Sequence, residues 1–410
     1  MAKATHRDKG SGGLHKRASD GMWIATIELP PGPDGKRRRK TVARKDRGEA
    51  QRELRRLRSE LDAAGDLPTR NLRVADWMRH YLQDVAPTKD RPKTLTGKVA
   101  ASRDYIVPLL GRKRLDRLTT DDVYTLHRAV LNTPKKKELR GLDPDQLPEG
   151  TIMLSPSAAA VVHNTLAAAL NVAIRERKIN VNVCDLVDRP RPRRSEDNAL
   201  STEQARTLVR HIVDHPETPL AELWLMYLLT GARRAELLGT EIERVTDVID
   251  LSWQLQAFQP KEIKHLRGRP DFEARHVAGS CYLTRPKTSG SWRTPPNVDP
   301  LRTLMSRAIG PRESGLVFVR EDGGPVHPDA ATHGWKRLLA DAGLGEDVTL
   351  HGTRHTAVDL LYEMGVPEHV IMQIVGHTGR AMTRSYRTRM DLDSAGTALS
   401  GLGERLGITG

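Results

Sequence analysis

The sequence predicts a multidomain, mainly helical protein with small β elements. Three observations predict this class: a length of 410 residues, apolar residues at helical spacing through most of the chain, and strand-like runs confined to two regions. The length exceeds that of one ordinary domain, and a hydrophobic content of 38% is sufficient to build cores. We therefore expect a small β-sheet backed by one helix, then a helical region, then an α+β region.

Composition and charge restrict the partners. The formal charge is +14 and the pI is near 9.9, which indicates a polyanionic partner. The start MAKATHRDKG has no apolar core like a signal peptide, and no run of about 18 apolar residues is apparent, so a soluble cytoplasmic protein is expected. Cys184 and Cys281 are far apart and lack zinc-binding spacing, which favours two reduced thiols. Phosphate-loop and dinucleotide motifs are absent, so nucleotide-driven chemistry is not indicated.

Residues 1–70 are predicted to form the sheet with its helix. The run 22–29 has strand composition, 30–35 is a turn cluster, and 36–42 begins a second strand. Leucines at helical spacing within 47–64 predict the helix. A solvated surface is one interpretation of the cations that open the second strand, but a two-stranded hairpin fits the DNA major groove. We therefore predict DNA contacts from Lys36, Arg37, Arg38, Arg39 and Lys40.

Residues 71–188 are predicted to be almost entirely helical. Prolines in 133–154 predict a long loop, which is either functional or disordered. An N-cap signal at Leu118–Val123 begins one helix, and Ser155 followed by Pro156 begins another. The expected helices are 74–82 ending before Pro87, 94–107 stopped by Pro108, one following the Leu118–Val123 signal, and 155–177.

Residues 189–198 are predicted to be an extended basic linker, because alternating prolines exclude a helix. A simple spacer and a phosphate contact are equally good interpretations of its arginines. The candidate DNA contacts here are Arg191, Arg193 and Arg194.

Residues 199–390 are predicted to form the α+β domain. Ser201 and Gln204 match a capping box, and 220–229 is predicted to be a buried helix. Residues 391–410 are expected to form a tail that packs either on its own domain or on a neighbouring subunit. The predicted strands are 277–284, 292–295 and 317–319, with a turn at 286–290.

Residues suited to phosphate chemistry concentrate in this domain. Thr230–Glu236 reads TGARRAE, and Lys287 lies in the turn PKTSG. His351 and Arg354 are three residues apart, a spacing that places both on one face of a helix. Arginine forks bind two phosphate oxygens, and a tyrosine becomes a nucleophile when cations or a base act on its phenol. His377 follows a helix in a GH turn, and Tyr386 lies nine residues further on.

These segments resemble the tyrosine recombinase (phage integrase) family. The family pattern is an arginine in TGxRxxE, a hairpin lysine, HxxR, a GH turn and a tyrosine about nine residues later, and every piece occurs here in order. The resemblance implies Tyr386 as nucleophile, Lys287 as general acid and Glu236 as a supporting residue. It assigns the phosphate-binding and proton-transfer roles to Arg233, His351, Arg354 and His377.

The resemblance also implies an architecture and partners. Residues 1–70 would be an arm-binding domain, 71–188 a SAM-like core-binding domain and 199–390 the catalytic domain. The partner would be double-stranded DNA at attachment sites, bound by a homotetramer, with an excisionase or host DNA-bending protein as possible accessory factors. No metal or cofactor is expected, and the site of action is the nucleoid of a bacterial host. An integrase of an actinobacterial phage or integrative element matches best.

Several alternatives remain open from the sequence. A chromosome-dimer or transposon recombinase, a type IB topoisomerase and a catalytically inactive DNA-binding relative share parts of the pattern. Lys261 and Lys264 compete with Lys287, and Arg234, beside Arg233, is interpreted as a surface or DNA-backbone residue. A zinc site at His351 and His355 lacks HExxH and an acidic or cysteine ligand. The attachment-site sequences cannot be predicted.

Overall fold

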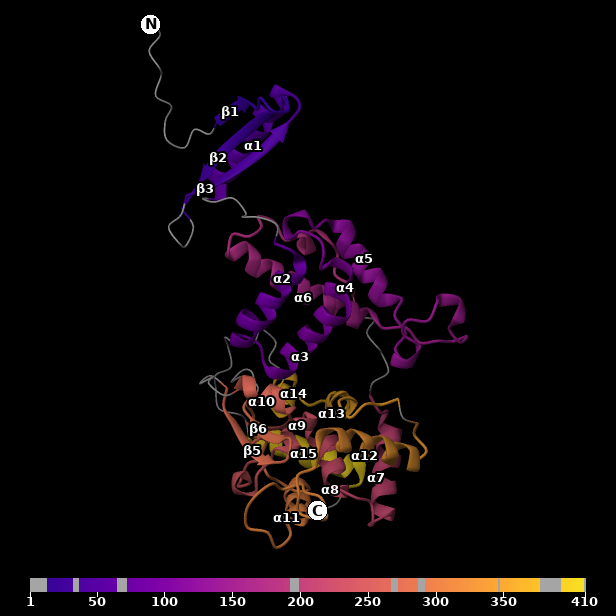
Figure 1. Cartoon of the computed structure of the whole chain (residues 1–410). Helices are drawn as coiled ribbons and strands as arrows, with labels where there is room; N and C mark the ends of the chain where they lie inside the picture. The colour runs from indigo at the N-terminus through magenta and orange to yellow at the C-terminus, as the bar shows by residue number, and fades with distance from the viewer. Residues whose placement is uncertain are drawn as a thin grey trace. The chain divides into compact units, whose positions relative to one another are not determined.

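The computed structural model describes residues 13–31, 37–64, 72–191, 199–266, 272–286, 292–345, 347–376 and 392–408. The chain divides into two units, Met1–Arg193 and Arg194–Gly410 (Figure 1). Within them, buried apolar residues form three separate clusters, which are centred on the N-terminal sheet, on the helical region and on the C-terminal unit. The fold is mainly helical with small sheets, as the sequence predicts.

The N-terminal sheet has three antiparallel strands in the order β1-β2-β3, with α1 packed against it (Figure 1). Alternate residues of β2 face the helix, and Ile27 and Leu57 are fully buried between them. The short strand β1 was not predicted, because its sequence GLHK has no apolar alternation. The bounds are β1 Gly13–Lys16, β2 Trp23–Leu29, β3 Arg38–Arg44 and α1 Arg47–Ala64.

The helical region packs around α6. The indole N–H of Trp77 donates to the carbonyl of Ala169 over 2.8 Å and ties α2 to α6. The predicted stop at Pro108 is wrong. The helix continues through a π-helical turn at Ser102–Ile106, and Pro108 then lies in the first turn of α4, where a missing N–H is tolerated. The α-helices are α2 Val74–His80, α3 Pro92–Ala101, α4 Val107–Leu110, α5 Thr120–Leu131 and α6 Pro156–Arg175.

Helix α6 is long and apolar enough to span a membrane, contrary to the expectation that the sequence has no apolar run of that length. However, 56% of the apolar stretch of α6 is buried, and Leu166 and Leu170 are fully enclosed by the other helices of this region. Such burial is typical of the core helix of a globular domain.

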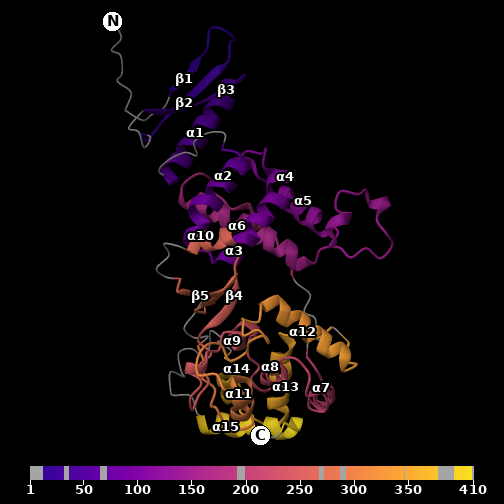
Figure 2. The ribbon, with the colours of Figure 1, turned by 60° about the horizontal axis from the view of Figure 1, so that its bottom comes forward.

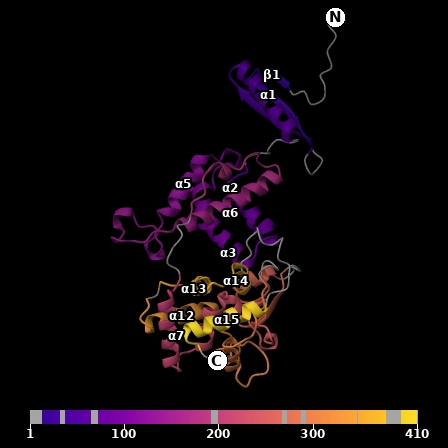
Figure 3. The ribbon, with the colours of Figure 1, turned by 180° about the vertical axis from the view of Figure 1, so that it is seen from behind.

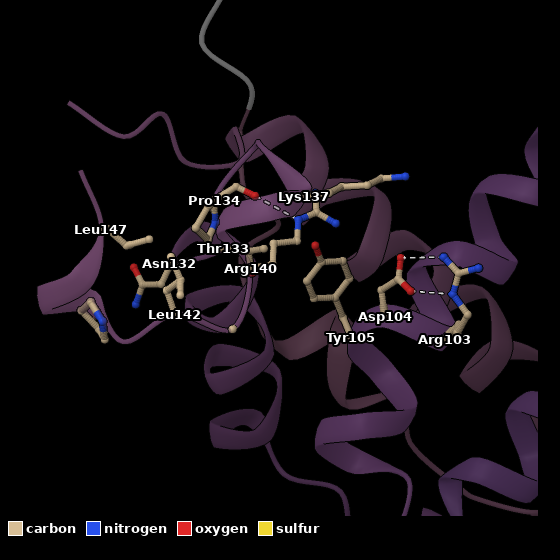
Figure 4. Close-up of a pocket in the computed structure, with 12 residues that line it drawn as sticks. Arg103, Asp104, Tyr105, Asn132, Thr133, Pro134, Lys137, Arg140, Leu142 and Leu147 are labelled. Atoms are coloured by element: carbon tan, nitrogen blue, oxygen red, sulfur yellow. Dashed lines mark hydrogen bonds and ion pairs between the residues drawn. The ribbon is translucent and has the colours of Figure 1, made fainter. Parts of the chain in front are cut away.

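Residues 133–154 form an ordered excursion rather than a structureless loop. Its two ends pair, since Lys135 N–H donates to the Ile152 carbonyl over 2.8 Å and Leu154 N–H to the Thr133 carbonyl over 2.9 Å. The excursion folds back toward Tyr105 and lines an open pocket of about 570 Å³ (Figure 4). Arg140 closes the fold by donating to the Pro134 carbonyl over 3.0 Å. The interpretation of this segment as disordered is therefore not supported.

Two buried histidines join α5 to α6. Nε2 of His127 lies 3.1 Å from Nδ1 of His163, and the two residues are only 7% and 6% exposed. Burial lowers the pKa of both rings. His163 lowers the pKa of His127 further, and Arg189 does the same for His163 against the opposing charge of Asp185. Both imidazoles are therefore neutral at pH 7 and share one hydrogen bond.

The histidine pair makes the helical region sensitive to acid. An unfolded histidine has a pKa of about 6.5, so the unfolded chain takes up more protons than the folded one once the pH falls below that value. The stabilisation is complete above about pH 6.5 and is lost as the pH falls toward the lowered folded pKa values. We expect amide exchange in α5 and α6 to accelerate between pH 7.5 and 5.5, after correction for intrinsic rates, and to accelerate less in a His163→Asn variant. Equal acceleration in both proteins would contradict this prediction.

The other elements of the C-terminal unit lie around α8 (Figure 2). The α8 residues from Leu223 to Thr230 are all buried. The capping box at α7 is confirmed, since Ser201 N–H donates to Gln204 Oε1 over 2.9 Å and Gln204 N–H to Ser201 Oγ over 3.2 Å. The α-helices are α7 Thr202–Asp214, α8 Ala221–Thr230, α9 Arg234–Leu238, α10 Pro260–Leu266, α11 Leu301–Ile309, α12 Pro328–Asp341, α13 Gly352–Glu363, α14 Glu368–Val375 and α15 Leu392–Leu406.

The sheet of this unit has the order β4-β6-β5 and is antiparallel. The predicted strand 277–284 is in fact split, because Gly279 has a φ of 54° and turns the chain back on itself. The predicted strands 292–295 and 317–319 form only single bridges or isolated bonds, such as Leu251 N–H to the Arg293 carbonyl over 3.0 Å. The bounds are β4 Gln254–Ala257, β5 Ala274–Ala278 and β6 Cys281–Thr284.

The C-terminal helix α15 packs on its own unit against α7, α8, α13 and α14 (Figure 3). Leu399 and Leu402 are fully buried, and Arg206 Nε donates to the Arg405 carbonyl over 2.9 Å. A Cβ on Gly403 would lie 2.5 Å from Pro300, so only glycine permits this close approach. Of the two predicted arrangements of the tail, the single chain adopts the one within its own domain.

Candidate active site

Four of the predicted site residues, Arg233, Glu236, His351 and Arg354, lie within the described part of the C-terminal unit. Lys287, His377 and Tyr386 lie outside the described residues. The described residues therefore include both predicted phosphate-binding arginines, Arg233 and Arg354.

Arg233 is positioned by the turn between α8 and α9. Gly231 ends α8 with a φ of 54°, and Arg233 adopts an extended conformation immediately before α9. Its Nη1 donates to Glu236 Oε1 over 2.6 Å, and its backbone N–H donates to Glu236 Oε2 over 2.9 Å. The Arg233 side chain remains 33% exposed, whereas that of Glu236 is fully buried. Glu236 thus orients an arginine that solvent, or a ligand, can still reach.

Arg354 lies in the first turn of α13 and is only 2% exposed. Its Nη1 donates to the Gly231 carbonyl over 3.0 Å, so Arg354 is hydrogen-bonded to the same turn that positions Arg233. Burial lowers the pKa of Arg354 to about 9, with the positive charges of Arg293 and Arg233 acting in the same direction and Glu236 opposing them. Arg354 is still charged at pH 7, in a place where the folded protein disfavours the charge.

His351 immediately precedes α13 and reaches solvent, while Arg354 points into the unit. The His351 ring contacts that of His355 edge to face, with the ring centroids 5.6 Å apart. Partial burial lowers the pKa of His351, and His355, Arg354 and Arg233 lower it further. His351 is therefore neutral at pH 7 and able to accept a proton or a hydrogen bond.

Arg293 is a central residue that sequence reasoning missed. It is 5% exposed, and its Nη2 donates to Glu236 Oε2 over 2.6 Å. Its Nη1 donates to the carbonyls of Thr230, over 3.2 Å, and Ile374. The neighbouring Trp292 is 50% exposed, so the local pattern resembles that of a surface strand and gives no signal of a buried arginine.

Positive charge exceeds negative charge at this site. Arg233, Arg293 and Arg354 surround Glu236, whose carboxylate balances one of the three. Burial alone would raise the pKa of Glu236, but the charge of Arg293 and the hydrogen bonds from Arg233 outweigh it and lower the pKa. Glu236 is therefore ionised, and the excess positive potential suits a phosphate group.

The remaining predicted DNA contacts differ in exposure, and each of them stays a prediction. Arg234 is partly buried, its Nη1 donates to the Pro328 carbonyl over 2.9 Å and to Thr332 Oγ1 of α12, and its contact with the DNA backbone stays a prediction. Arg37 is paired with Glu28, whereas Arg39 on β3 and Arg191 are exposed. Arg38 and Lys40 are half-buried on β3, and Lys36, Arg193 and Arg194 lie outside the described residues.

Among the described residues, no group of three or more His, Cys, Asp or Glu side chains is arranged to hold a metal ion. Cys184 and Cys281 are both free and buried in different units. Burial raises the pKa of Cys184 to about 12, so this thiol is protonated and inert at pH 7.

Known proteins similar to this chain include integrases. The sequence profile described as the phage integrase family matches residues 198–391. An integrase of Saccharopolyspora erythraea is 24% identical over 91% of this chain and 92% of its own length. An integrase of Streptomyces ambofaciens is 27% identical over 94% of each chain.

Solved structures share the fold. The Tn1549 transposon integrase in complex with transposon right end DNA has a TM-score of 0.58 at 20% identity, covering 82% of this chain and 100% of that one. A lambda integrase tetramer bound to a Holliday junction has a TM-score of 0.53 at 15% identity, covering 92% and 98%. Fold and sequence together define a tyrosine recombinase, a class of DNA strand-exchange enzymes. Within that class, residues 198–391 of the chain match the phage integrase family.

Proposed function

We propose that this protein is a site-specific integrase that cleaves and rejoins DNA through a 3′-phosphotyrosyl intermediate at Tyr386. The observation that carries the proposal is the joint positioning of Arg233 and Arg354. One is oriented by Glu236 and the other by the Gly231 carbonyl of the same turn. Two arginines fixed on one short turn, with excess positive charge, suit the non-bridging oxygens of a phosphodiester.

The reaction replaces one phosphoester bond in DNA with one phosphoester bond to tyrosine, so the bond energy is retained for rejoining. The Tyr386 oxygen attacks phosphorus and forms the phosphotyrosyl bond, while the bond to the 5′ oxygen breaks. Lys287 gives its proton to that leaving oxygen, and neutral His351 accepts the phenol proton or orients the phosphate. His377 donates to a non-bridging oxygen. It follows Gly376, whose carbonyl lies 3.4 Å from Arg233 Nη2, which supports a place for it beside the phosphate.

The rest of the chain serves to hold DNA. Residues 1–70 bind arm sites, with Lys36–Lys40 at the groove, and residues 71–188 close over the crossover site. The linker 189–198 contacts phosphates through Arg191, Arg193 and Arg194, and residues 199–390 carry the reaction. Four copies assemble, two cleaving at a time through a Holliday junction, at the bacterial nucleoid and with an excisionase or host bending protein as regulators.

The main alternative is a chromosome-dimer or transposon-type recombinase, and a second is an inactive DNA-binding relative. The sheet of β1–β3 with its cationic strand favours an arm-binding integrase over two-domain recombinases. The buried Glu236 and Arg354 beside a partly exposed Arg233 favour an active enzyme over a binding protein, since binding alone does not need a buried cation.

Covalent capture tests the proposed function. The full chain is incubated, with chelator present, with a nicked duplex that was selected for capture from a randomised pool. The adduct is then digested and mapped by mass spectrometry. We expect a phosphotyrosyl peptide at Tyr386 in wild type and none in Tyr386→Phe. An adduct at another residue, or binding without any adduct, would reject the proposal.

DNA affinity should depend steeply on salt. Each phosphate neutralised lowers the logarithm of the affinity by about 0.9 per logarithm of salt concentration. We expect a slope steeper than about −4 for the full chain between 50 and 200 mM salt, because strand β3 and the linker contact phosphates in addition to the catalytic unit. Arg39→Ala should weaken binding and make the slope less negative by about one. A flat salt response would contradict an electrostatic mode of binding.

A further inference from the structure

Arg293 connects three segments that the proposed site requires. Its Nη1 bonds the carbonyls of Thr230, at the end of α8, and Ile374, in the last turn of α14. Its Nη2 bonds Glu236 in α9. Thr230 and Glu236 lie six positions apart, but Ile374 lies 138 positions after Glu236, so one buried guanidinium determines how α14 meets the turn between α8 and α9.

The contact with Glu236 is the one that reaches the phosphate site. One oxygen of the carboxylate, Oε1, accepts from the Arg233 side chain, and the other, Oε2, accepts from Arg293. A carboxylate held from both sides cannot rotate without breaking one charged bond. The orientation of the exposed Arg233 guanidinium therefore depends on Arg293.

The second connection runs through the end of α14. Gly376 has a φ of 72°, and a Cβ there would lie 2.9 Å from Cδ of Arg293. The Arg293 side chain thus occupies the space beside the turn from which residue 377 continues, and the Gly376 carbonyl lies 3.4 Å from Arg233 Nη2. The positive charge of Arg293 lowers the pKa of Arg354 more than that of Arg233 does, so Arg293 also acts on the second arginine.

We propose that Arg293 is a positioning residue that holds Arg233, through Glu236, and the start of the His377 turn in the geometry that receives the phosphate. Arg293 is itself buried and does not touch DNA. The proposal rests on the proposed function. It assigns Arg293 to the phosphate cage and not to the proton donor Lys287, although the two are only six positions apart in sequence.

The test compares two arginine-to-lysine exchanges in the full chain. Arg312 is the matched control, because its guanidinium also bonds backbone carbonyls of the same unit, including those of Leu316, over 2.6 Å, and Val317, over 2.7 Å. Single-turnover adduct formation is measured on the nicked duplex selected from a randomised pool. We expect Arg293→Lys to slow it about 100-fold, because a misplacement of about 1 Å has an effect of that size, with DNA affinity within about twofold of wild type. Arg312→Lys should stay within about twofold in rate.

A second substrate separates the phosphate cage from the proton donor. Sulfur in place of the 5′ bridging oxygen leaves as a thiolate and needs no proton. We expect this substrate to restore the rate of Lys287→Ala but not that of Arg293→Lys. Restoration of Arg293→Lys would place Arg293 with the proton donor and overturn the proposal.

The outcomes distinguish the two levels of inference. If wild type forms no adduct, then the proposed function fails and the role of Arg293 fails with it. If wild type reacts and Arg293→Lys reacts as fast as Arg312→Lys, then only the role of Arg293 fails. Arg293→Lys that does not fold at 20 °C, as judged by circular dichroism, would also overturn the proposal, because the residue would then be purely structural.

Discussion

Replacing Arg354 with methionine should abolish most DNA cleavage while leaving the fold intact. Loss of one pre-aimed donor to a developing charge slows an enzyme by about 100- to 1,000-fold, and we expect that loss in single-turnover cleavage. Arg354→Lys should recover only part of the rate, because an ammonium lacks the planar fork that contacts two phosphate oxygens. The comparison is made at saturating protein, so that weaker DNA binding does not contribute.

The stability of the same variant provides the control. Burial and the charges of Arg293 and Arg233 already disfavour the Arg354 cation, which is why its pKa is lowered to about 9. Methionine fills a similar volume without the charge, so the melting temperature of the variant should stay within about 3 °C of wild type. A fall in melting temperature that parallels the fall in rate would mean that Arg354 acts through the fold.

Replacing Glu236 with glutamine should have the largest effect on stability. Glu236 is fully buried, and its loss of charge leaves Arg293 as a buried cation without its counter-ion. Breaking such a pair costs about 3–5 kcal/mol, equivalent to a fall of about 10 °C in the melting temperature of a unit of this size. Cleavage should fall as well, because Arg233 loses its charged partner.

Two controls identify the cause. Glu363 forms an exposed ion pair with Arg405, so Glu363→Gln should change stability by less than about 1 kcal/mol. The double variant Glu236→Gln with Arg293→Met should be more stable than Glu236→Gln alone, since no uncompensated charge remains. A double variant less stable than either single variant would contradict the charge argument.

The pKa of Glu236 is lowered in the folded protein, so its carboxylate stabilises the folded state above the unfolded pKa of about 4.3. This stabilisation is lost as the pH falls below that value.

The features that could be predicted from sequence have local causes. The capping boxes at Ser201 and Thr119 each need only residues three positions apart, and both form. The positions of Arg233 and Glu236 follow from one short helix begun at a glycine turn. The helix beginning at Pro156 is likewise indicated by that proline, although the expected cap from the Ser155 side chain does not form.

The features that could not be predicted depend on distant contacts. Arg293 is buried only because carbonyls from α8 and α14 converge on it, and neither lies near it in sequence. Arg234 is bound to the start of α12 through the Pro328 carbonyl, which lies 94 positions away in sequence. The helix continues past Pro108 because a π-helical turn precedes it, so that the N–H that proline lacks is not needed. The spacing of apolar residues does not predict such a turn.

One measurement tests the phosphate cage most directly. A methylphosphonate at the scissile position replaces a charged non-bridging oxygen with a neutral methyl group, so that there is less charge for an arginine to stabilise. If Arg354 acts on that charge, then Arg354→Met will lose about 100- to 1,000-fold on the phosphodiester but far less on the methylphosphonate. Wild type and the variant would then cleave the neutral substrate at similar rates. An equal loss on both substrates would show that Arg354 does not neutralise the phosphate, and the account of this site would be wrong.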